Sequence, residues 1–541
     1  MRLYRLGLAY VSMCAVLTGC AEGGPGMPND LQEDLGPATP SGPSGDGIVT
    51  GEIPGGAKEP DESEITGQDT VFVMNTERFF TSVGVAVRGK DMSSDPPEVL
   101  LRTHSGFTRI TGAPYNGGYR FLGVPQGEYY LRTGRVYVLT DERHVEIGRN
   151  ALGRQDTVFT PSYDTPLSVN LTNLAPWQQA GGLAYGSRLQ FVSGNVDFAG
   201  EANFYNAIPT GTTELETSDA VANNMANFVP IFEAAKGDGL YVNQLTNVFG
   251  KPLPTTGAPL VVNSLVRSMQ VPPFDFAADG ITPLTISGAL QEVPPSNVSL
   301  EWRLGAFTPY ASDVHPAATP RTPSFYIDVS AHGPEEGWIG YSGEVLSFLL
   351  PQGASFTLTD RLPYGNPYPA NWRLVASAHY AFRAMEAPPG SGGLLRSLSG
   401  SIASMDYLEN LVAAPIVPRL TPPRALTIDG IPATSQRVVG NTSPIISWQP
   451  PANGAPTAYR VTLQRYSEEY YTLMGQNYFY LPGTATEVRL PPGILEPDTV
   501  YAVRVMAIDS PNAEVTRRPF STSELLPIYS ADTTSSFFST P

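Results

Sequence analysis

Cysteine is nearly absent from this chain: its 541 residues contain only Cys14 and Cys20. Both lie in the first twenty residues, so the rest of the chain has no thiol that could form a disulfide. Zinc and iron–sulfur sites built on thiolates are excluded for the same reason. The body of the protein must therefore be stabilised by its hydrophobic cores, which domains of about 100 residues or more can manage.

Charge is also scarce, because Asp, Glu, Lys and Arg make up only 16% of the residues and the formal net charge is −18. Gly and Pro are abundant, at 53 and 52 residues, and so are Tyr and Phe, at 26 and 23. This balance disfavours long solvated helices and favours many short strands and turns. Neither residues 21–69 nor the remainder of the chain after them is basic, so we expect no binding of nucleic acid through its phosphates.

The short motifs of common catalytic sites are missing. The five histidines are His104, His144, His315, His332 and His379. None has the His-x-x-x-His spacing of many zinc enzymes, and no Gly-x-Ser-x-Gly elbow, P-loop or Gly-x-Gly-x-x-Gly occurs. We therefore expect no catalytic residue, no metal and no cofactor.

Two acidic stretches are weaker candidates for chemistry. Asp313 and His315 would share one face of an extended segment, but the sequence shows no nucleophile beside them, which favours a loop pair. Asp275 and Asp279 supply two acids of a calcium loop without its alternation or its closing Glu, which favours an acidic turn over a cation site.

The N-terminus has the pattern of an export signal: Arg2 and Arg5, then an apolar run from Leu6 to Leu17. A helix of twelve residues rises only about 18 Å, too little for a bilayer core of about 30 Å. The next residues, Leu-Thr-Gly-Cys ending at Cys20, resemble the lipobox of bacterial lipoproteins. The resemblance implies cleavage of residues 1–19 and lipidation of Cys20. A plain secretory signal with a chance cysteine is the alternative.

Residues 20–69 form an acidic tether rich in Gly and Pro. The stretch after the cysteine holds eleven acids and a single base, Lys58. Apolar residues are sparse, so the segment cannot offset the entropy of ordering, and we expect it to be disordered. An arm lying along the first domain is the alternative.

Residues 70–165 read as strands, with an Asn-Gly turn at Asn116–Gly117. The stretch from Tyr119 to Leu131, Tyr-x-Phe…Val-Pro-x-Gly-x-Tyr-x-Leu, resembles the end of a carboxypeptidase regulatory-like (prealbumin-like) β-sandwich. That module is non-catalytic in its family, so the resemblance implies a fold and no peptidase activity.

Residues 166–414 continue the β pattern as one large domain of one or two units. Val298, Leu300 and Trp302 alternate with polar neighbours, as in a half-buried strand. One helix is predicted near residues 219–235, since Val221, Met225, Phe228, Val229 and Phe232 would share one face. It would plug the end of a sheet or, alternatively, act as a mobile lid.

A Pro-rich linker, residues 415–423, precedes a last domain at 424–541. Trp448-Gln-Pro-Pro and the Leu-x-Pro-x-Thr-x-Tyr run ending at Tyr501 resemble a fibronectin type III domain. The resemblance implies that Trp448 fills the core and that the Tyr501 hydroxyl bonds to backbone at a corner between strands.

This last domain departs from its family in a longer, aromatic segment. Four tyrosines are candidate ligand-binding residues, since aromatic faces bind sugars and anchor interfaces. They are Tyr470, Tyr471, Tyr478 and Tyr480. The alternative is a hairpin that packs these rings across its own strands.

The sequence thus predicts an all-β, multi-domain chain of β-sandwiches anchored to a membrane by lipid at Cys20. Ala21, rather than Asp, follows that cysteine, which in the lipoproteins it resembles points to the outer membrane. We expect a non-enzymatic binding, adhesion or scaffolding protein with a polysaccharide or protein partner. The alternative is an accessory protein or hydrolase acting on envelope polysaccharide, with a site in residues 166–414.

Overall fold

The computed structural model describes residues 69–104, 106–160, 165–224, 229–332, 337–338, 340–467 and 471–541. Strands dominate these ranges, and the helices are single turns, which confirms the expected all-β fold class. The helices are α1 (Ala311–Val314) and α2 (Leu408–Leu411), and the 3₁₀ turns are η3 (Ala234–Lys236), η4 (Leu304–Ala306) and η5 (Thr308–Tyr310). No helix in these ranges is long and apolar enough to cross a membrane. Cys20 and the expected tether lie outside them, apart from Asp69.

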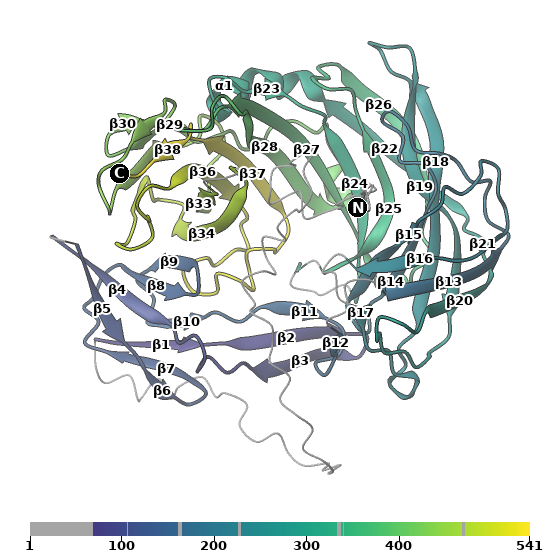
Figure 1. The fold of residues 1–541 in the computed structure, drawn as a ribbon, viewed down its shortest axis with the longest axis horizontal. Helices are drawn as coiled ribbons and strands as arrows, with labels where there is room; N and C mark the ends of the chain where they lie inside the picture. The colour runs from purple at the N-terminus through teal and green to yellow at the C-terminus, as the bar shows by residue number, and fades with distance from the viewer. Residues whose placement is uncertain are drawn as a thin grey trace.

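The largest sheet has 23 strands, and most of them follow one another in a single hydrogen-bonded run. In spatial order the run is β20 (Leu284–Ala289), β13 (Thr165–Thr172), β16 (Leu215–Asn224), β15 (Phe198–Phe204), β14 (Arg188–Ser193), β18 (Leu240–Pro252), β19 (Pro259–Val271), β25 (Tyr341–Leu349), β24 (Ser324–Ser330), β27 (Arg373–Glu386), β28 (Arg396–Tyr407), β37 (Ile528–Thr534), β36 (Val500–Asp509), β33 (Ala458–Tyr466), β34 (Leu473–Pro482), β9 (Val136–Thr140), β8 (Tyr129–Thr133), β4 (Glu98–Thr103) and β5 (Gly106–Thr111). Four short strands attach at its sides: β21 (Gln291–Glu292), β23 (Thr319–Pro320), β31 (Arg437–Val438) and β38 (Phe538–Ser539). Figure 1 shows this run curving around the centre of the molecule.

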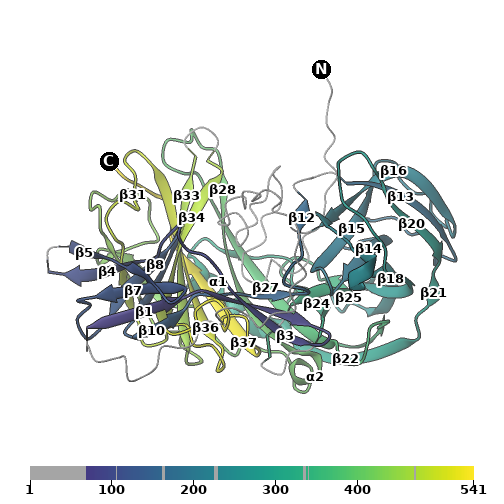
Figure 2. The ribbon, with the colours of Figure 1, turned by 90° about the horizontal axis from the view of Figure 1, so that it is seen from below.

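Smaller sheets complete the ring and cover it from outside. They are β10 (His144–Glu146)–β1 (Thr70–Met74)–β7 (Gly118–Leu122)–β6 (Ala113–Tyr115), β11 (Asn150–Leu152)–β2 (Thr76–Thr81)–β3 (Gly84–Gly89), β12 (Phe159–Thr160)–β17 (Val229–Pro230), β22 (Pro295–Arg303)–β26 (Thr357–Gly365), and β30 (Ile431–Pro432)–β29 (Arg424–Ile428)–β32 (Ile445–Gln449)–β35 (Glu487–Arg489). In Figure 1 the sheets of β1 and β2 close the ring opposite β27 and β28. Figure 2, from below, shows β1, β7 and β10 toward the end of the molecule that holds β33 and β34, and β13, β16 and β20 at the other end.

The main hydrophobic core lies on the outer face of the run. Phe325, Ile327 and Val329 of β24 are at most 1% exposed there. Strands β22, β26, β29 and β32 cover that face with their own apolar side chains. Trp302 of β22 contributes a ring centred 6.4 Å from that of Phe325, and Phe307 stacks on Tyr380 of β27. The alternation predicted for β22 is therefore the pattern of a strand with one face in this core.

The hydrogen bonding crosses the boundaries expected from the sequence. Strand β9, in the expected prealbumin-like range, pairs in parallel with β34 of the last domain, and β28 pairs with β37 across the Pro-rich linker. The three regions therefore share one sheet, so strands distant in the chain hold one another in place.

The structure shows the local surroundings of the Asn-Gly pair and of the aromatic residues Trp448 and Tyr501. Asn116 and Gly117 have φ values of 47° and 78°, so the Asn-Gly pair forms the tight turn between β6 and β7. Trp448 is 4% exposed in the core beside Tyr459. The hydroxyl of Tyr501 accepts a hydrogen bond of 2.9 Å from the backbone N–H of Glu496, five residues earlier in the chain.

The helix expected near residues 219–235 is wrong. Residues 215–224 form β16, which is hydrogen-bonded to β13 on one side and to β15 on the other. Val229 and Phe232 are buried in the core as expected, but through β17 and a bridge to Phe276. In residues 215–224, strand pairing outweighs a helical spacing of apolar residues, because it satisfies backbone hydrogen-bonding groups on both edges of the strand. Met225 and Phe228 of the expected helical face lie outside the described residues.

Candidate functional site

The aromatic segment of the last domain does not form the surface expected of it. Tyr478 and Tyr480 are 7% and 8% exposed, and they pack with the core of the N-terminal sandwich where β34 meets β9. Tyr471 is half-buried beside the small core of Ala384 and Phe537, and Tyr470 lies outside the described residues. The rings at Tyr478 and Tyr480 join two parts of the protein, which corrects their assignment as ligand-binding residues.

Polar side chains gather instead on the inner face of the curved run. Cross-strand pairing aligns them: Tyr326 of β24 lies opposite Ser347 of β25 and Ser377 of β27, and Ser347 lies opposite Asn263 of β19. We call this surface the inner polar face. Its residues are Arg188, Gln190, Glu201, Asn263, Tyr326, Asp328, Glu344, Ser347, Ser377, His379, Ser401, Thr462, Arg504 and Asp532.

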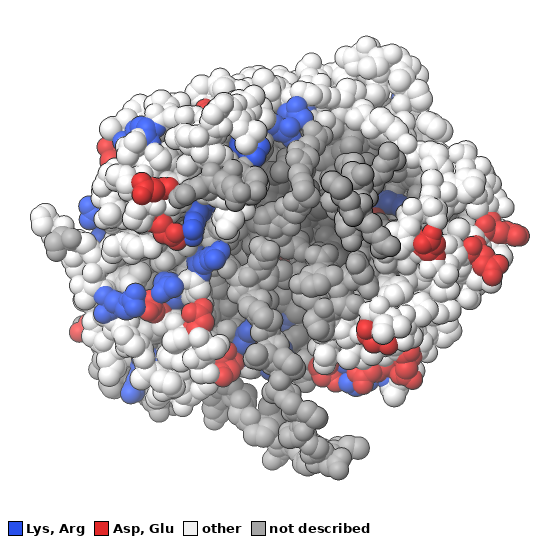
Figure 3. Space-filling view, viewed as in Figure 1, with Lys and Arg blue, Asp and Glu red and all other residues white. Residues whose placement is uncertain are grey.

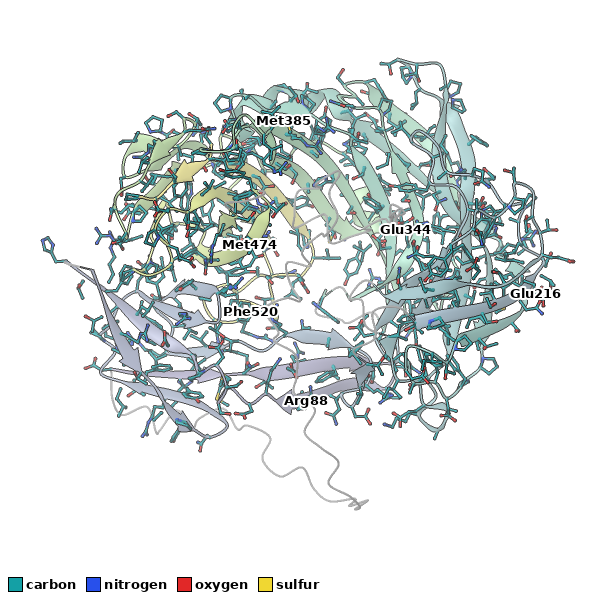
Figure 4. The ribbon with its side chains drawn as sticks, viewed as in Figure 1. Arg88, Glu216, Glu344, Met385, Met474 and Phe520 are labelled. Carbon is teal, nitrogen blue, oxygen red and sulfur yellow. The ribbon has the colours of Figure 1, made fainter. Side chains whose placement is uncertain are left out.

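Arg188 organises one end of the inner polar face. Its guanidinium contacts the carboxylates of Glu201 and Glu344, at 2.5 Å for Glu201, and its Nε donates to the Asn263 side chain at 2.9 Å. Glu344 is fully buried on the inner side of β25 (Figure 4), whereas Glu201 keeps 29% of its side chain accessible. Loss of solvation is the main cause that raises the pKa of Glu201, against the lowering effect of Arg188.

Gly343 allows strands β25 and β14 to approach each other at this end of the inner polar face. Gly343, just before Glu344, has φ of 111°, and a Cβ at this position would lie 2.7 Å from Gln190 Oε1. Without a side chain at Gly343, β25 approaches β14 closely enough for the Glu344 N–H to donate to Gln190 at 3.2 Å.

Asp328 lies beside this charged group without a partner. It sits opposite Glu344 across β24 and β25 and is 0% exposed. Neither of its carboxylate oxygens has a hydrogen-bond partner among the described residues. Burial is the main cause that raises the pKa of Asp328 well above its usual range, and the charge of Glu344 adds to it.

The middle of the face is built from small hydroxyls and a histidine. The Oγ atoms of Ser347 and Ser377, the Oγ1 of Thr462 and the Nε2 of His379 are buried and lack hydrogen-bond partners within the described ranges. Burial lowers the pKa of His379 to about 4, so its imidazole is neutral at physiological pH. Unpaired atoms thus lie on the adjacent strands β25, β24 and β27 and, beyond β28, β37 and β36, on β33; such buried unpaired atoms are uncommon in a protein interior.

A serine, a histidine and a carboxylate also meet on another part of the structure. The Nε2 of His315 lies 3.1 Å from Ser536 Oγ and 3.2 Å from Glu386 Oε1, and Ser536 donates to the same Oε1 at 2.8 Å. His315 Nδ1 accepts the N–H of Ala317, so in the neutral ring the proton is on Nε2. Nε2 then has no lone pair to take the serine proton, and the acid does not orient the other ring nitrogen as in a nucleophilic triad.

Asp313 and His315 do not form the expected acid–imidazole pair, since their side chains share no hydrogen bond or ion pair in the described part of the chain. His315 turns to Ser536 and Glu386, while the backbone carbonyl of Asp313 accepts from Thr533. A cavity of about 190 Å³ lies beside them, lined in part by Arg424 and Thr427. It is smaller than the pockets of about 300–1,000 Å³ that enclose most small-molecule ligands.

The acidic stretch at 275–279 forms a turn. The Asp279 carboxylate accepts hydrogen bonds from the N–H groups of Ile281 and Thr282 and from the Thr282 hydroxyl, and these bonds lower its pKa to about 2. Asp275 accepts from the N–H of Ala234 instead. Within the described ranges, no group of three or more His, Cys, Asp or Glu side chains is placed to hold a metal ion.

On the side shown in Figure 3, charges of both signs lie together on the left, whereas acidic side chains predominate on the right. On the left, Lys and Arg side chains are interspersed with Asp and Glu among the described residues. This distribution gives no extended basic surface on that side of the kind that tracks a phosphate backbone.

Comparison with known proteins adds little. No protein-family model matches the sequence, and no curated protein matches it. Weak structural similarity exists to a trypsin-activated α2-macroglobulin from Escherichia coli (11% identity, TM-score 0.13) and to a Salmonella α2-macroglobulin reacted with methylamine (10%, 0.12). The alignments cover 84% and 86% of this chain but only 29% of each of those chains. At such TM-scores the similarity supports no argument about fold or function.

Proposed function

We propose that this protein is a non-enzymatic binding protein of the bacterial envelope that recognises a polysaccharide through its inner polar face. The observation that carries the proposal is the set of buried hydrogen-bonding atoms without partners among the described residues, at Asp328, Ser347, Ser377 and His379 on adjacent strands and at Thr462 farther along the run. Sugar hydroxyls both donate and accept, so they can satisfy a surface that offers donors and acceptors together. Leaving such atoms unpaired costs about 1–3 kcal/mol each, which a bound hydroxyl or water recovers.

Access to the face is available at its charged end. Glu201 is 29% exposed and Arg188 11%, whereas Ser377 and His379 are at most 2% exposed. A glycan would therefore enter beside Arg188 and Glu201 and insert a chain end or a single residue.

The placement at the envelope is part of the proposal and rests on the sequence. Lipid on Cys20 would hold the body at the outer membrane, and two or three acyl chains suffice for stable anchoring. Mass spectrometry of the purified protein should find Cys20 acylated as the first residue. A Cys20→Ser variant should appear in the soluble fraction, whereas an unmodified thiol in the wild type would remove the anchor from the proposal.

Retention of polysaccharide tests the binding function. The full chain, extracted in detergent and immobilised, should retain a fraction of envelope polysaccharide that Ser377→Val retains at least tenfold less. Thr359→Val, on an exposed position of the outer hairpin strand β26, is the matched control and should bind like the wild type. Equal retention by all three proteins, or none by the wild type, would overturn the proposal.

A hydrolase is the second candidate, favoured by the two adjacent carboxylates of unequal environment. Asp328 has a raised pKa, suited to a general acid, while Glu344 is held by Arg188. Release of reducing ends from the retained polysaccharide, lost in Asp328→Asn, would establish this activity in place of simple binding.

A further inference from the structure

The charges at the Arg188 end of the inner polar face do not balance. One guanidinium serves the carboxylates of Glu201 and Glu344, and Asp328 adds a third acid beside them. Removing one partner from a buried ion pair is strongly destabilising because an uncompensated charge remains. Among the described residues, the group thus brings together three acids and one guanidinium.

Protonation of Asp328 would remove its negative charge, but the neutral carboxyl would still need hydrogen-bond partners. A protonated carboxyl carries an O–H donor and keeps acceptor capacity, but neither oxygen has a hydrogen-bond partner in the described part of the chain. A water molecule could supply hydrogen bonds without any charge. A group that brings both a positive charge and several N–H donors would satisfy Asp328 and compensate the excess acid.

An organic cation fits this position better than a metal ion. The described residues offer no set of three or more His, Cys, Asp or Glu ligands, and a guanidinium already occupies the centre of this cluster. A primary ammonium has three N–H donors and no acceptor, which suits the two free oxygens of Asp328 and the nearby carboxylate of Glu344.

We propose that the Asp328–Glu344 pair is a subsite for a primary ammonium group, and that the bound glycan carries it as a deacetylated amino sugar. This inference rests on the proposed glycan-binding function and names its ligand class. Charged hydrogen bonds are stronger than neutral ones in a buried site, so the amine rather than the hydroxyls would set the specificity.

The experiment compares two trisaccharides that differ only in their acetyl groups. Titration calorimetry of the full-length protein in detergent uses the glucosamine trimer and the N-acetylglucosamine trimer as probes. The amine-bearing trimer should bind at least tenfold more tightly at neutral pH. Asp328→Asn should reduce this ratio to about one, while Asp509→Asn, at a half-buried acid on β36 near Arg419, should leave the ratio unchanged.

The outcomes separate this inference from the proposed function. Equal binding of both trimers by the wild type would overturn the ammonium subsite and leave glycan binding intact. Binding of neither trimer, together with no retention of envelope polysaccharide, would overturn both. An amine preference that persists in Asp328→Asn would also contradict the assignment, provided that circular dichroism shows the variant folded.

Discussion

The two faces of strand β27 are equally buried but differ in whether their polar atoms have hydrogen-bond partners. Ala378, Tyr380 and Phe382 face outward into a close-packed core, where Tyr380 also donates its hydroxyl to the backbone of Ala354. Ser377 and His379 alternate with them on the inner side, equally buried, with Ser377 Oγ and His379 Nε2 unpaired among the described residues. Burial alone therefore does not identify a core, and the pairing of polar atoms distinguishes the two faces.

The largest contrast should come from truncating the outer face. Phe325→Ala should lower the free energy of unfolding by about 3–5 kcal/mol, because it removes a fully buried ring that stacks on Phe348 and approaches Trp302. Urea unfolding followed by tryptophan fluorescence measures the loss. A change below about 1 kcal/mol would show that the outer face is not the main core.

Adding a hydroxyl to the outer face should lower the free energy of unfolding by less than Phe325→Ala does, but by a measurable amount. Ala378→Ser buries an oxygen among apolar side chains, so we expect a loss of about 1–3 kcal/mol in the same unfolding experiment. An unchanged free energy of unfolding would mean that water reaches this face.

The pH dependence of stability should separate Asp328 from ordinary surface acids. Because its pKa is raised in the folded protein, the folded state holds the proton more tightly than the unfolded chain. Without ligand, wild-type stability should therefore fall as the pH rises above about 4, the ordinary pKa of Asp. Asp328→Asn should lose this component, so its stability relative to wild type should increase from pH 4 to pH 7. A constant difference between the two proteins would show that Asp328 titrates normally.

The smallest effect should come from the inner face of β27. Ser377→Ala removes a hydroxyl that has no partner among the described residues, so the free energy of unfolding should rise, by about 1 kcal/mol. Compared with Ala378→Ser, one position away, it gives a matched pair on a single strand. A large loss from Ser377→Ala would show that this hydroxyl is satisfied in solution by a structural water.

The sequence predicts strands and local motifs better than it predicts the site. Alternating residues such as Val298, Leu300 and Trp302 identify strands because the period of two is a local property. The prediction of a helix near residues 219–235 is wrong because the spacing of apolar residues carries no information about β13 and β15, the strands that pair with β16. The site depends on contacts such as Arg188 with Glu344, which are 156 residues apart in the chain.

One signal for the inner polar face was present in the sequence. Ser377 and His379 alternate with apolar residues in the middle of β27, and the stretch from Leu374 to Phe382 has none of the Lys and Glu that usually mark a solvated face. Such alternation normally indicates a strand with one side in water. Only the curvature of the whole run, to which residues 98 to 534 contribute, turns that side toward the centre of the molecule.

The most direct test is a titration of fragmented envelope polysaccharide into the full-length protein and into a variant with Ser347, Ser377 and Thr462 all replaced by Ala. If the inner polar face binds the glycan, the affinity should fall more than tenfold while the unfolding temperature stays within a few degrees of wild type. Equal affinity in a variant that is folded would contradict the assignment of function to this face.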